Sequence, residues 1–276
     1  MRNCIIVLLL LTGCSATYNG ERLFSKATHL YEPISKNPKT ATPEQFAAAI
    51  GAFERVTMQA RGTSWAARAH VSIGSLYAIQ QEYGKAREAY GLTLQNYNQY
   101  KELCLTARTA IAKTYESEAN WDEAVKAYRD IVDFYPWTKT GLESPLYIGA
   151  MYVKRQQPEQ AKKAFESAVG HYSKLLPNAP NPEMGLEVNG YLALAYQQLG
   201  EWDHAIAVLE ELAGVPNGVN RPVVLLSLGS IYQAKLGDTQ KAQAAYSALV
   251  AEFPNHPLGK EAKTRLEHLA VSIVPR

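Results

Sequence analysis

Small, aromatic and apolar residues recur along the chain with a long period, most clearly between residues 74 and 254. Five segments each contain a small residue, a Tyr three positions later, an Ala nine or ten positions after the Tyr, and usually an aromatic residue four positions beyond the Ala. Successive tyrosines are 38, 37, 44 and 36 residues apart. Self-similarity at a period of this length is typical of helical repeat architectures. Each segment therefore predicts a pair of consecutive helices.

These segments resemble the tetratricopeptide repeat (TPR), whose standard length is about 34 residues. In that family the small residue lets two helices approach closely, the Tyr fills the gap between them, and the Ala lies where the second helix crosses the first. Tyr83, Trp121 and Trp202 mark the expected starts of second helices, and Pro136 and Pro254 mark ends, because proline cannot continue a helix. In chain order the segments contain Gly74, Tyr77, Ala86 and Tyr90; Ala112, Tyr115, Ala124 and Tyr128; Gly149, Tyr152, Ala161 and Phe165; Ala193, Tyr196, Ala205 and Leu209; and Gly229, Tyr232, Ala242 and Tyr246.

Two irregularities in the spacing predict local differences between repeats. The step of 44 residues coincides with the segment LLPNAPNPEMG, from Leu175 to Gly185, which we expect to be a loop between helix pairs. Gly237 is expected in a turn one residue longer than the corresponding turns of the other repeats.

The chain also predicts helices on both sides of the five repeats. Thr42-Pro43-Glu44-Gln45 is a strong helix start, with Thr as the N-cap, Pro at the first position and Gln three residues after the cap. A helix before it, over about residues 20–34, would complete a degenerate first pair. After the repeats, residues 256–270 carry Leu258, Ala262, Leu266 and Leu269 on one face, as expected of a helix that caps a solenoid.

The fold class predicted is therefore all-α, a TPR-like α-solenoid of helix-turn-helix repeats with a C-terminal capping helix. We expect a degenerate first helix pair over residues 22–62, five TPR-like repeats over residues 63–255, and the capping helix and tail over residues 256–276.

The first residues, MRNCIIVLLLLTGCSA, predict export and a lipid anchor. A positive Arg2 precedes an apolar run from Ile5 to Leu11, which is typical of a signal peptide and far shorter than the about 20 residues that span a bilayer. Leu11-Thr12-Gly13-Cys14 resembles the lipobox of bacterial lipoprotein precursors. The resemblance implies cleavage after residue 13, acylation of Cys14 with chains such as palmitate, and a lipidated tether over residues 14–21. Ser15, in place of the Asp that retains many lipoproteins in the inner membrane, implies the outer membrane.

Charge and composition exclude several classes of function. The formal net charge is +2, with no concentrated basic stretch, so we expect no nucleic acid partner. The three cysteines form no C-x-x-C pair, the six histidines form no H-x-x-x-H pair, and no phosphate-binding glycine loop is present. We expect no metal site, no cofactor, no catalytic residues and no enzymatic activity. Cys104 is expected to be a small buried apolar residue.

The resemblance to the TPR places a binding groove along the first helices of the pairs, which line the concave face of a solenoid. In that family the groove takes the positions nine, six and two before, and one and two after, each repeat tyrosine. Trp65 and Trp137 lie outside this register and are either interface residues or turn residues packed on their own helix pairs. Candidate groove residues are Arg68, Ser75, Ile79, Thr109, Lys113, Glu116, Lys154, Leu194, Gln197, Gln198, Leu226 and Gln233. They predict a groove of mixed polarity that holds proteins or peptides of the cell envelope.

The combination of a lipobox with long repeats that fill the chain resembles the BamD family of the outer-membrane β-barrel assembly machine. Phrases such as EFPNHPLGKEAKTRLEHL carry that resemblance. It implies a lipid-anchored periplasmic scaffold for protein–protein interaction in outer-membrane assembly. The YbgF-type coordinator of the Tol-Pal system and the TPR lipoprotein that pilots pilus secretins are alternatives. They would make the chain an accessory module of a peptidoglycan, polysaccharide, pilus or secretion machinery.

Overall fold

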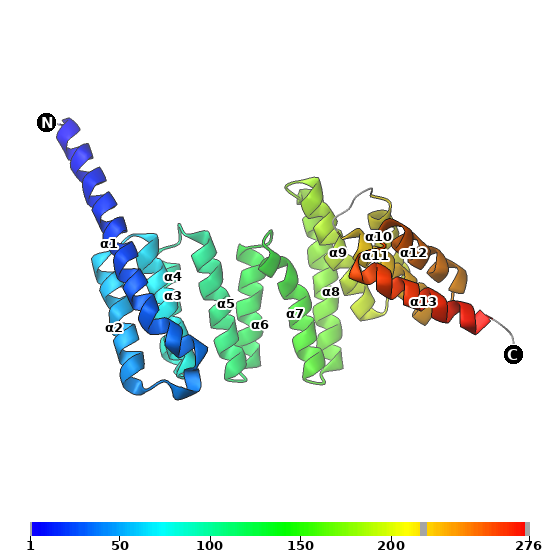
Figure 1. Cartoon of the computed structure of the whole chain (residues 1–276), viewed down its shortest axis with the longest axis horizontal. Helices are drawn as coiled ribbons and strands as arrows, with labels where there is room; N and C mark the ends of the chain where they lie inside the picture. The colour runs from blue at the N-terminus through cyan, green and yellow to red at the C-terminus, as the bar shows by residue number, and fades with distance from the viewer. Residues whose placement is uncertain (1, 216–219, 274–276) are drawn as a thin grey trace. The chain divides into compact units, whose positions relative to one another are not determined.

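The computed structural model describes residues 2–215 and 220–273, with side chains described over residues 16–215 and 220–269. Within these ranges the chain is helical and has no strand, which confirms the predicted all-α class (Figure 1). None of the described helices is long and apolar enough to cross a membrane. Residues 274–276 of the expected tail lie outside the described residues.

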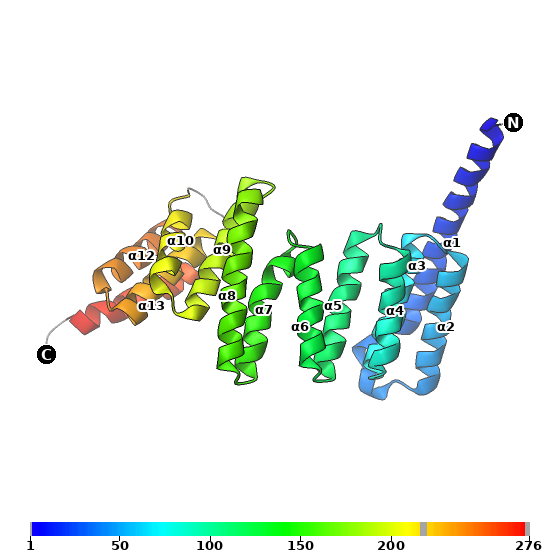
Figure 2. The ribbon, with the colours of Figure 1, turned by 180° about the vertical axis from the view of Figure 1, so that it is seen from behind.

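The helices form two compact units, Met1–Pro136 and Trp137–Arg276. Consecutive helices pack as antiparallel pairs that can be followed from both sides in Figures 1 and 2. The first unit contains α1 (Arg2–Lys36), α2 (Pro43–Gln59), α3 (Ser64–Ile79), α4 (Tyr83–Asn96), α5 (Lys101–Ser117) and α6 (Trp121–Phe134), with the short 3₁₀ turn η1 (Pro38–Thr40). The second contains α7 (Lys139–Lys154), α8 (Pro158–Leu175), α9 (Pro182–Leu199), α10 (Trp202–Ala213), α11 (Arg221–Ile231), α12 (Thr239–Glu252) and α13 (Pro257–Ile273), with the 3₁₀ turn η2 (Leu176–Asn178) and the π-helical turn η3 (Tyr232–Leu236).

The first pair, α1 and α2, begins its second helix as the sequence predicts. The Thr42 hydroxyl accepts a hydrogen bond from the Gln45 N–H, and the Gln45 side chain accepts one from the Thr42 N–H. This reciprocal arrangement satisfies two backbone donors that the first turn of a helix leaves open. Phe53 and Val56 of α2 are buried beneath α1, where Phe24 packs 5.3 Å from the Phe53 ring.

The segment expected as a tether, residues 14–21, lies within α1 and is helical. Its end is packed on the first unit. The Asn19 side chain donates a hydrogen bond to the Gln59 side chain, and a Cβ atom added to Gly20 would lie 2.7 Å from the Cβ atom of Ala60. Asn19 and Gly20 are therefore part of the body, and any free tether is shorter than the sequence predicts.

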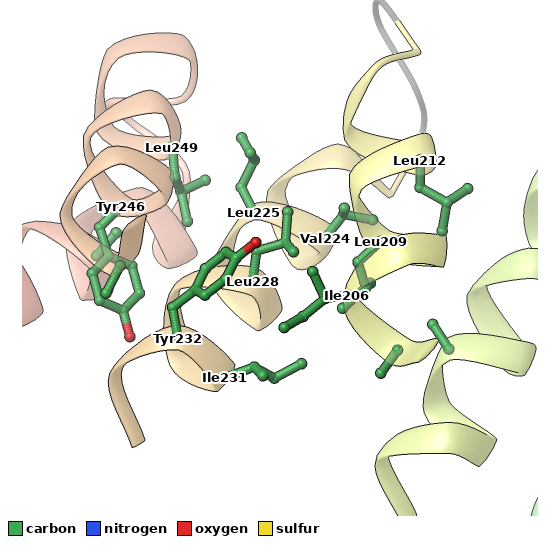
Figure 3. Close-up of a cluster of buried hydrophobic side chains, with 14 of the residues drawn as sticks. Ile206, Leu209, Leu212, Val224, Leu225, Leu228, Ile231, Tyr232, Tyr246 and Leu249 are labelled. Carbon is green, nitrogen blue, oxygen red and sulfur yellow. The ribbon is translucent and has the colours of Figure 1, made fainter. Parts of the chain in front are cut away.

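The second unit has its largest core among α10, α11, α12 and α13. Leu209 and Leu212 come from α10, Leu225 and Leu228 from α11, and Leu249 from α12 (Figure 3). The capping helix contributes the face that the sequence predicts: Ala262 and Leu269 are buried in this core, and Leu258 and Leu266 pack against it.

The segment that makes the spacing between the third and fourth repeat tyrosines 44 residues contains a shorter loop than expected. The predicted loop from Leu175 to Gly185 is wrong at both ends, because Leu175 is the last residue of α8 and α9 begins at Pro182. The Asn181 side chain caps α9 by accepting the Met184 N–H at 2.8 Å. Both α8 and α9 have 18 residues, so much of the extra length extends helices.

Each repeat tyrosine lies in or next to the last turn of the first helix of its pair. Its carbonyl accepts the N–H five residues later in four repeats, as in the 2.9 Å bond from Glu82 to Tyr77. In the fifth repeat the acceptor is Tyr232 and the donor is Asp238, six residues later, and Gly237 has a φ of +66°. The prediction of a longer turn at Gly237 is confirmed, and the π-helical turn η3 absorbs the additional residue.

Candidate functional site

Three of the candidate groove residues take part in hydrogen bonds inside their own helix pairs. The Tyr90 hydroxyl donates to the Ser75 hydroxyl at 3.3 Å, and the Tyr128 hydroxyl donates to the Glu116 carboxylate at 2.5 Å. The Tyr246 hydroxyl donates to the Gln233 side-chain oxygen at 2.9 Å. In each case an aromatic residue of the second helix reaches a polar residue of the first. Ser75, Glu116 and Gln233 therefore hold helix pairs together.

The other candidate groove residues are distributed over both units. Arg68, Lys113, Lys154, Leu194 and Gln198 are exposed. Arg68 also lies over the ring of Trp65, 5.6 Å from its centroid. Thr109, whose hydroxyl donates to the Leu105 carbonyl of its own helix, is half-buried, as are Ile79, Gln197 and Leu226. Only Leu194 and Gln197 among the twelve line a described cavity.

That cavity is a groove of about 600 Å³ in the second unit, which we call the α9–α11 groove. It opens between α9 and α11, the first helices of two consecutive pairs, with α10 at its base. Its residues are Asn181, Glu183, Met184, Leu186, Glu187, Gly190, Tyr191, Leu194 and Gln197 from α9 and its cap; Leu209, Leu212 and Val215 from α10 and the segment after it; and Asn220, Arg221, Val223, Val224 and Ser227 from α11 and its cap.

The floor of the α9–α11 groove is apolar and belongs to the core of the second unit. Leu209 and Leu212 of α10 and Val224 of α11 line it and are also members of the buried core shown in Figure 3. Above this floor, Leu194 of α9 is 41% exposed and Val223 of α11 is 52% exposed. Pockets of this size with an apolar lining and a few polar groups are typical binding sites.

The charged residues of the groove are two carboxylates and one neutralised guanidinium. Arg221 holds α11 to α12: its Nε and Nη2 atoms donate to the Glu252 carboxylate at 2.5 and 2.7 Å, and its Nη1 atom donates to the Ala213 carbonyl. Glu183 and Glu187, one turn apart on α9, have no ion-pair partner among the described residues. The rim of the groove is therefore acidic.

Tyr191 forms part of the α9 wall of the groove and lies near two carboxylates. Burial raises the pKa of Tyr191 to about 12, and the carboxylates of Glu143 and Glu187 add to the increase. Its ring is stacked on Tyr172 of α8, with 5.9 Å between the centroids. Tyr191 is thus a neutral, fixed wall of the groove.

The sequence register could have found three of the groove residues that were not among the candidates. Glu187 and Gly190 stand nine and six positions before Tyr196, and Val223 stands nine before Tyr232. These are the positions that the resemblance to the TPR assigns to the groove. By contrast, Glu183 of α9 and Ser227 of α11 lie outside that register, and only the packing of these two helices brings them to the rim.

A second hollow, of about 520 Å³, lies in the first unit. Arg61, His70 and Asn96 line it together with the 69% exposed Met58 and the buried Tyr97. Burial lowers the pKa of His70. Its lining comes from ends of α2 and α4 as well as from α3, so it lies outside the row of first helices that forms the expected groove.

The two tryptophans outside the repeat register pack on their own units. Trp65 lies 5.4 Å from the Phe24 ring, and Trp137 packs against the core that contains Leu142 and Tyr172. Cys104 is a free thiol with 3% exposure, which confirms its prediction as a small buried residue. Among the described residues no group of three His, Cys, Asp or Glu side chains could hold a metal ion. The Cys14 side chain lies outside the described residues.

Models of the tetratricopeptide repeat match this chain in three segments: residues 107–136 and 223–256 match one model, and residues 192–222 match another. The last two segments contain α10, α11 and α12, of which α10 and α11 form the base and one wall of the α9–α11 groove.

Among curated proteins, the serine/threonine-protein kinase PknD of Chlamydia abortus is 30% identical to this chain over 100 residues. The match covers 36% of this chain and 10% of the kinase, so the chain spans about a tenth of the length of the curated relatives that it matches.

Solved structures similar to this chain include a TPR protein and a pilus biogenesis factor. A thermophilic TPR protein of Thermus thermophilus is 18% identical, with a TM-score of 0.44, over 74% of this chain and 99% of the other. PilW, a type IV pilus biogenesis factor, is 16% identical, with a TM-score of 0.44, over 86% of this chain and 97% of the other.

The in-phase repeat residues, the helix pairs that they form and the matched repeat models lead to one assignment. The described helix pairs form a TPR-like α-solenoid, in which residues 107–136, 192–222 and 223–256 match models of the tetratricopeptide repeat, a fold that typically serves as a scaffold for protein–protein interaction.

Proposed function

We propose that this protein is a lipid-anchored scaffold of the bacterial cell envelope that holds another protein along its row of first helices. The observation that carries the proposal is the combination, in one chain, of the Leu11-Thr12-Gly13-Cys14 lipobox with an array of helix pairs. The lipobox would determine where the protein is located, and the array of helix pairs would provide the surface that binds a partner.

An anchor at Cys14 fits the packing of the first unit. Cleavage before Cys14 would begin the mature chain inside α1, and Gly20 is already packed against Ala60. Six residues of helix rise by about 9 Å. Lipid chains on Cys14 would therefore keep the first unit close to the membrane surface. Two or more acyl chains give lasting attachment, whereas a single chain gives only marginal binding.

The finer part of the proposal is a place at the periplasmic face of the outer membrane, in the assembly of outer-membrane proteins. Ser15 after the lipidated cysteine and the resemblance to the BamD family support it. A role in a peptidoglycan, polysaccharide, pilus or secretion machinery is the alternative, and the choice between them depends on the partner.

Metabolic labelling with a fatty acid analogue tests the anchor. Wild-type protein is expected to be labelled and to sediment with membranes, whereas Cys14→Ser is expected to lose the label and to be released. Cys104→Ala is the matched control, because it removes a buried cysteine and is expected to keep the label. Persistent labelling of Cys14→Ser would overturn the anchor.

Crosslinking in cells followed by purification from detergent-solubilised envelopes tests the scaffold. Recovery of barrel-assembly components at the same ratio in repeated purifications would support the finer proposal. Recovery of only glycan synthases, glycan hydrolases or pilus secretin components would replace it with the alternative. A chain that crosslinks to no protein at all would overturn the scaffold itself.

A further inference from the structure

We infer that the α9–α11 groove binds a segment of a partner protein in which apolar side chains are flanked by Lys or Arg. The inference rests on the proposed scaffold function and names the chemistry of the partner at one place in the array. It concerns a groove built entirely within the second unit, by α9, α10 and α11.

Apolar side chains that stay exposed to solvent in the fold would contact the apolar side chains of the partner. Leu194 and Val223 are 41% and 52% exposed, and they stand on the two helices that face each other across the groove. Leu186 and Tyr191 continue the apolar wall on α9. An exposed apolar patch rimmed by polar residues marks a surface that another molecule covers. Apolar side chains of a partner would replace water over this floor.

The size of the groove limits what can enter it. About 600 Å³ lies within the range of pockets that enclose a small molecule or a few side chains. The floor residues Leu209, Leu212 and Val224 belong to the core, so the groove cannot deepen without disrupting α10 and α11. A short peptide segment fits these limits, while a flat surface of a folded domain would leave the floor uncovered.

The charged part of this recognition comes from the acidic rim. Glu183 and Glu187 project from the α9 side, and the one cation among the described lining residues, Arg221, is committed to Glu252 at 2.5 and 2.7 Å. A partner carboxylate here would meet like charges without a free cation, whereas Lys or Arg would meet two carboxylates. Complementary rim charges chiefly increase the association rate and the selectivity.

The polar side chains of the rim suit a peptide backbone. Asn181, Gln197, Asn220 and Ser227 line the groove on both sides of the apolar floor. Asn181 already caps α9 through its oxygen, and the other three can donate to or accept from a bound main chain. The groove therefore offers apolar contact at its floor and hydrogen bonding at its edges.

The test uses the mature chain with Cys14→Ser, so that it can be purified without lipid, and fluorescent synthetic peptides of equal length. One peptide carries leucines one helical turn apart, flanked by lysines. A second has glutamates in place of the lysines, and a third has serines in place of the leucines. We expect only the lysine–leucine peptide to bind with appreciable anisotropy change, and its affinity to fall as salt increases.

Variants of the groove assign the binding to individual residues. Val223→Lys is expected to abolish binding of the lysine–leucine peptide, because it removes an apolar contact and places a like charge in the groove. Glu183→Gln and Glu187→Gln are each expected to weaken it by about two- to fivefold, as for exposed ion pairs. The double variant Glu183→Lys, Glu187→Lys is expected to bind the glutamate–leucine peptide instead.

Matched controls exclude a general loss of structure. Val153→Lys changes a valine of α7 that is 55% exposed, close to the value for Val223, and lies outside the groove. Glu159→Gln changes an exposed carboxylate of α8 in the same way. Both are expected to bind the peptide like the wild type, and all variants are expected to keep the wild-type circular dichroism melting curve.

Failure of this inference is distinguishable from failure of the scaffold. Equal binding of lysine and glutamate peptides, or wild-type binding by Val223→Lys, would overturn the groove assignment. A dimer that forms with increasing concentration and is broken by Val223→Lys would also overturn it, because a second copy would then occupy the groove. In these cases a partner crosslinked equally by wild type and Val223→Lys would leave the scaffold function standing at another surface.

Discussion

Gly74 of α3 lies directly against the ring of Tyr90 of α4. A Cβ atom added to Gly74 would lie 2.5 Å from Cε1 of Tyr90, closer than any real side chain approaches an aromatic carbon. Gly149 against Phe165 and Gly229 against Tyr246 repeat the relationship in the third and fifth repeats. In these three repeats the glycine thus sets how closely the two helices of a pair approach, whereas the second and fourth repeats have Ala112 and Ala193 at this position.

Gly74→Ala is expected to lower the free energy of unfolding by about 1–3 kcal/mol, since the new methyl group must displace the buried Tyr90 ring. Chemical denaturation followed by circular dichroism measures the change. Gly91→Ala in α4 is the control with the opposite sign, because a Cβ atom there meets nothing within 4 Å. It is expected to stabilise by about 0.5–1 kcal/mol through the higher helix propensity of alanine. Equal effects of the two substitutions would contradict the close contact at Gly74.

The turns inside the repeats hold three residues other than glycine in the left-handed region. Gln81, Ala119 and Gln156 have φ values of +64°, +56° and +56°, and each stands four residues after its repeat tyrosine. Gly200 takes the same place in the fourth repeat with a φ of +74°. The left-handed conformation is therefore imposed by the hydrogen bond from the next residue's N–H to the tyrosine carbonyl, whatever residue occupies the left-handed position.

Ala119→Gly is expected to stabilise the protein by about 1 kcal/mol, because glycine reaches the left-handed region without the cost that a Cβ atom brings. Gly200→Ala is expected to destabilise by a similar amount for the same reason. Thermal and denaturant melts measure both. As a control, Ala48→Gly in the exposed interior of α2 is expected to destabilise by about 1 kcal/mol, as for any helix interior. Destabilisation by Ala119→Gly would show that the turn is not strained.

The local part of this fold could be predicted from sequence because short-range signals determine it. Tyr83, Trp121 and Trp202 begin second helices at the residues expected, and the Thr42 capping box is present. The missed start of α9 at Pro182 carries the same type of signal, an N-cap residue followed by Pro and Glu, which the surrounding prolines obscured.

For the groove, the sequence could predict which positions of the first helices are candidates, but not which of their side chains line it. Its first-helix positions follow from the spacing to Tyr196 and Tyr232, but side-chain direction depends on what the second helix presents. Glu116 and Gln233 share the position one after the tyrosine with Gln197, yet tyrosine hydroxyls from α6 and α12 engage the first two. In the fourth repeat Leu209 replaces that tyrosine, and Gln197 lines the groove. Whether a first-helix residue is free to line the groove therefore depends on a residue of the second helix, which the spacing within the first helix does not reveal.

Arg87 of α4 joins the first repeat to α5 of the second repeat. Its Nη1 atom donates to the Glu118 carboxylate at 2.6 Å and to the Thr114 hydroxyl at 3.2 Å, and its guanidinium lies 4.3 Å from the centroid of the Tyr115 ring. Arg87→Met is expected to cost about 1–2 kcal/mol, because it removes charge-assisted hydrogen bonds at a partly buried site. Arg87→Lys should recover only part of this, since lysine cannot form the planar stack. Lys126→Met breaks the exposed pair with Glu123 and is expected to change stability by less than about 0.5 kcal/mol.

The Tyr172 hydroxyl donates to the Leu142 carbonyl at 2.6 Å in the core of the second unit. Burial raises the pKa of Tyr172 well above its ordinary value, and burial also raises the pKa of its stacked neighbour Tyr191 to about 12. In the unfolded chain both tyrosines would titrate near pH 10. Between about pH 10 and 12 the unfolded state therefore releases protons that the folded state retains, so stability is fully present below pH 10 and falls as the pH rises.

Melting temperatures measured from pH 8 to 11 check this expectation. Tyr172→Phe should be less stable than the wild type at pH 8 by about 1 kcal/mol, through loss of the hydrogen bond, but should lose less stability on going to pH 11. The two curves therefore converge at high pH. Tyr18→Phe, at a side chain that is 73% exposed, is the control and should follow the wild-type curve. Parallel curves for Tyr172→Phe and wild type would mean that the buried hydroxyl does not govern the alkaline loss of stability.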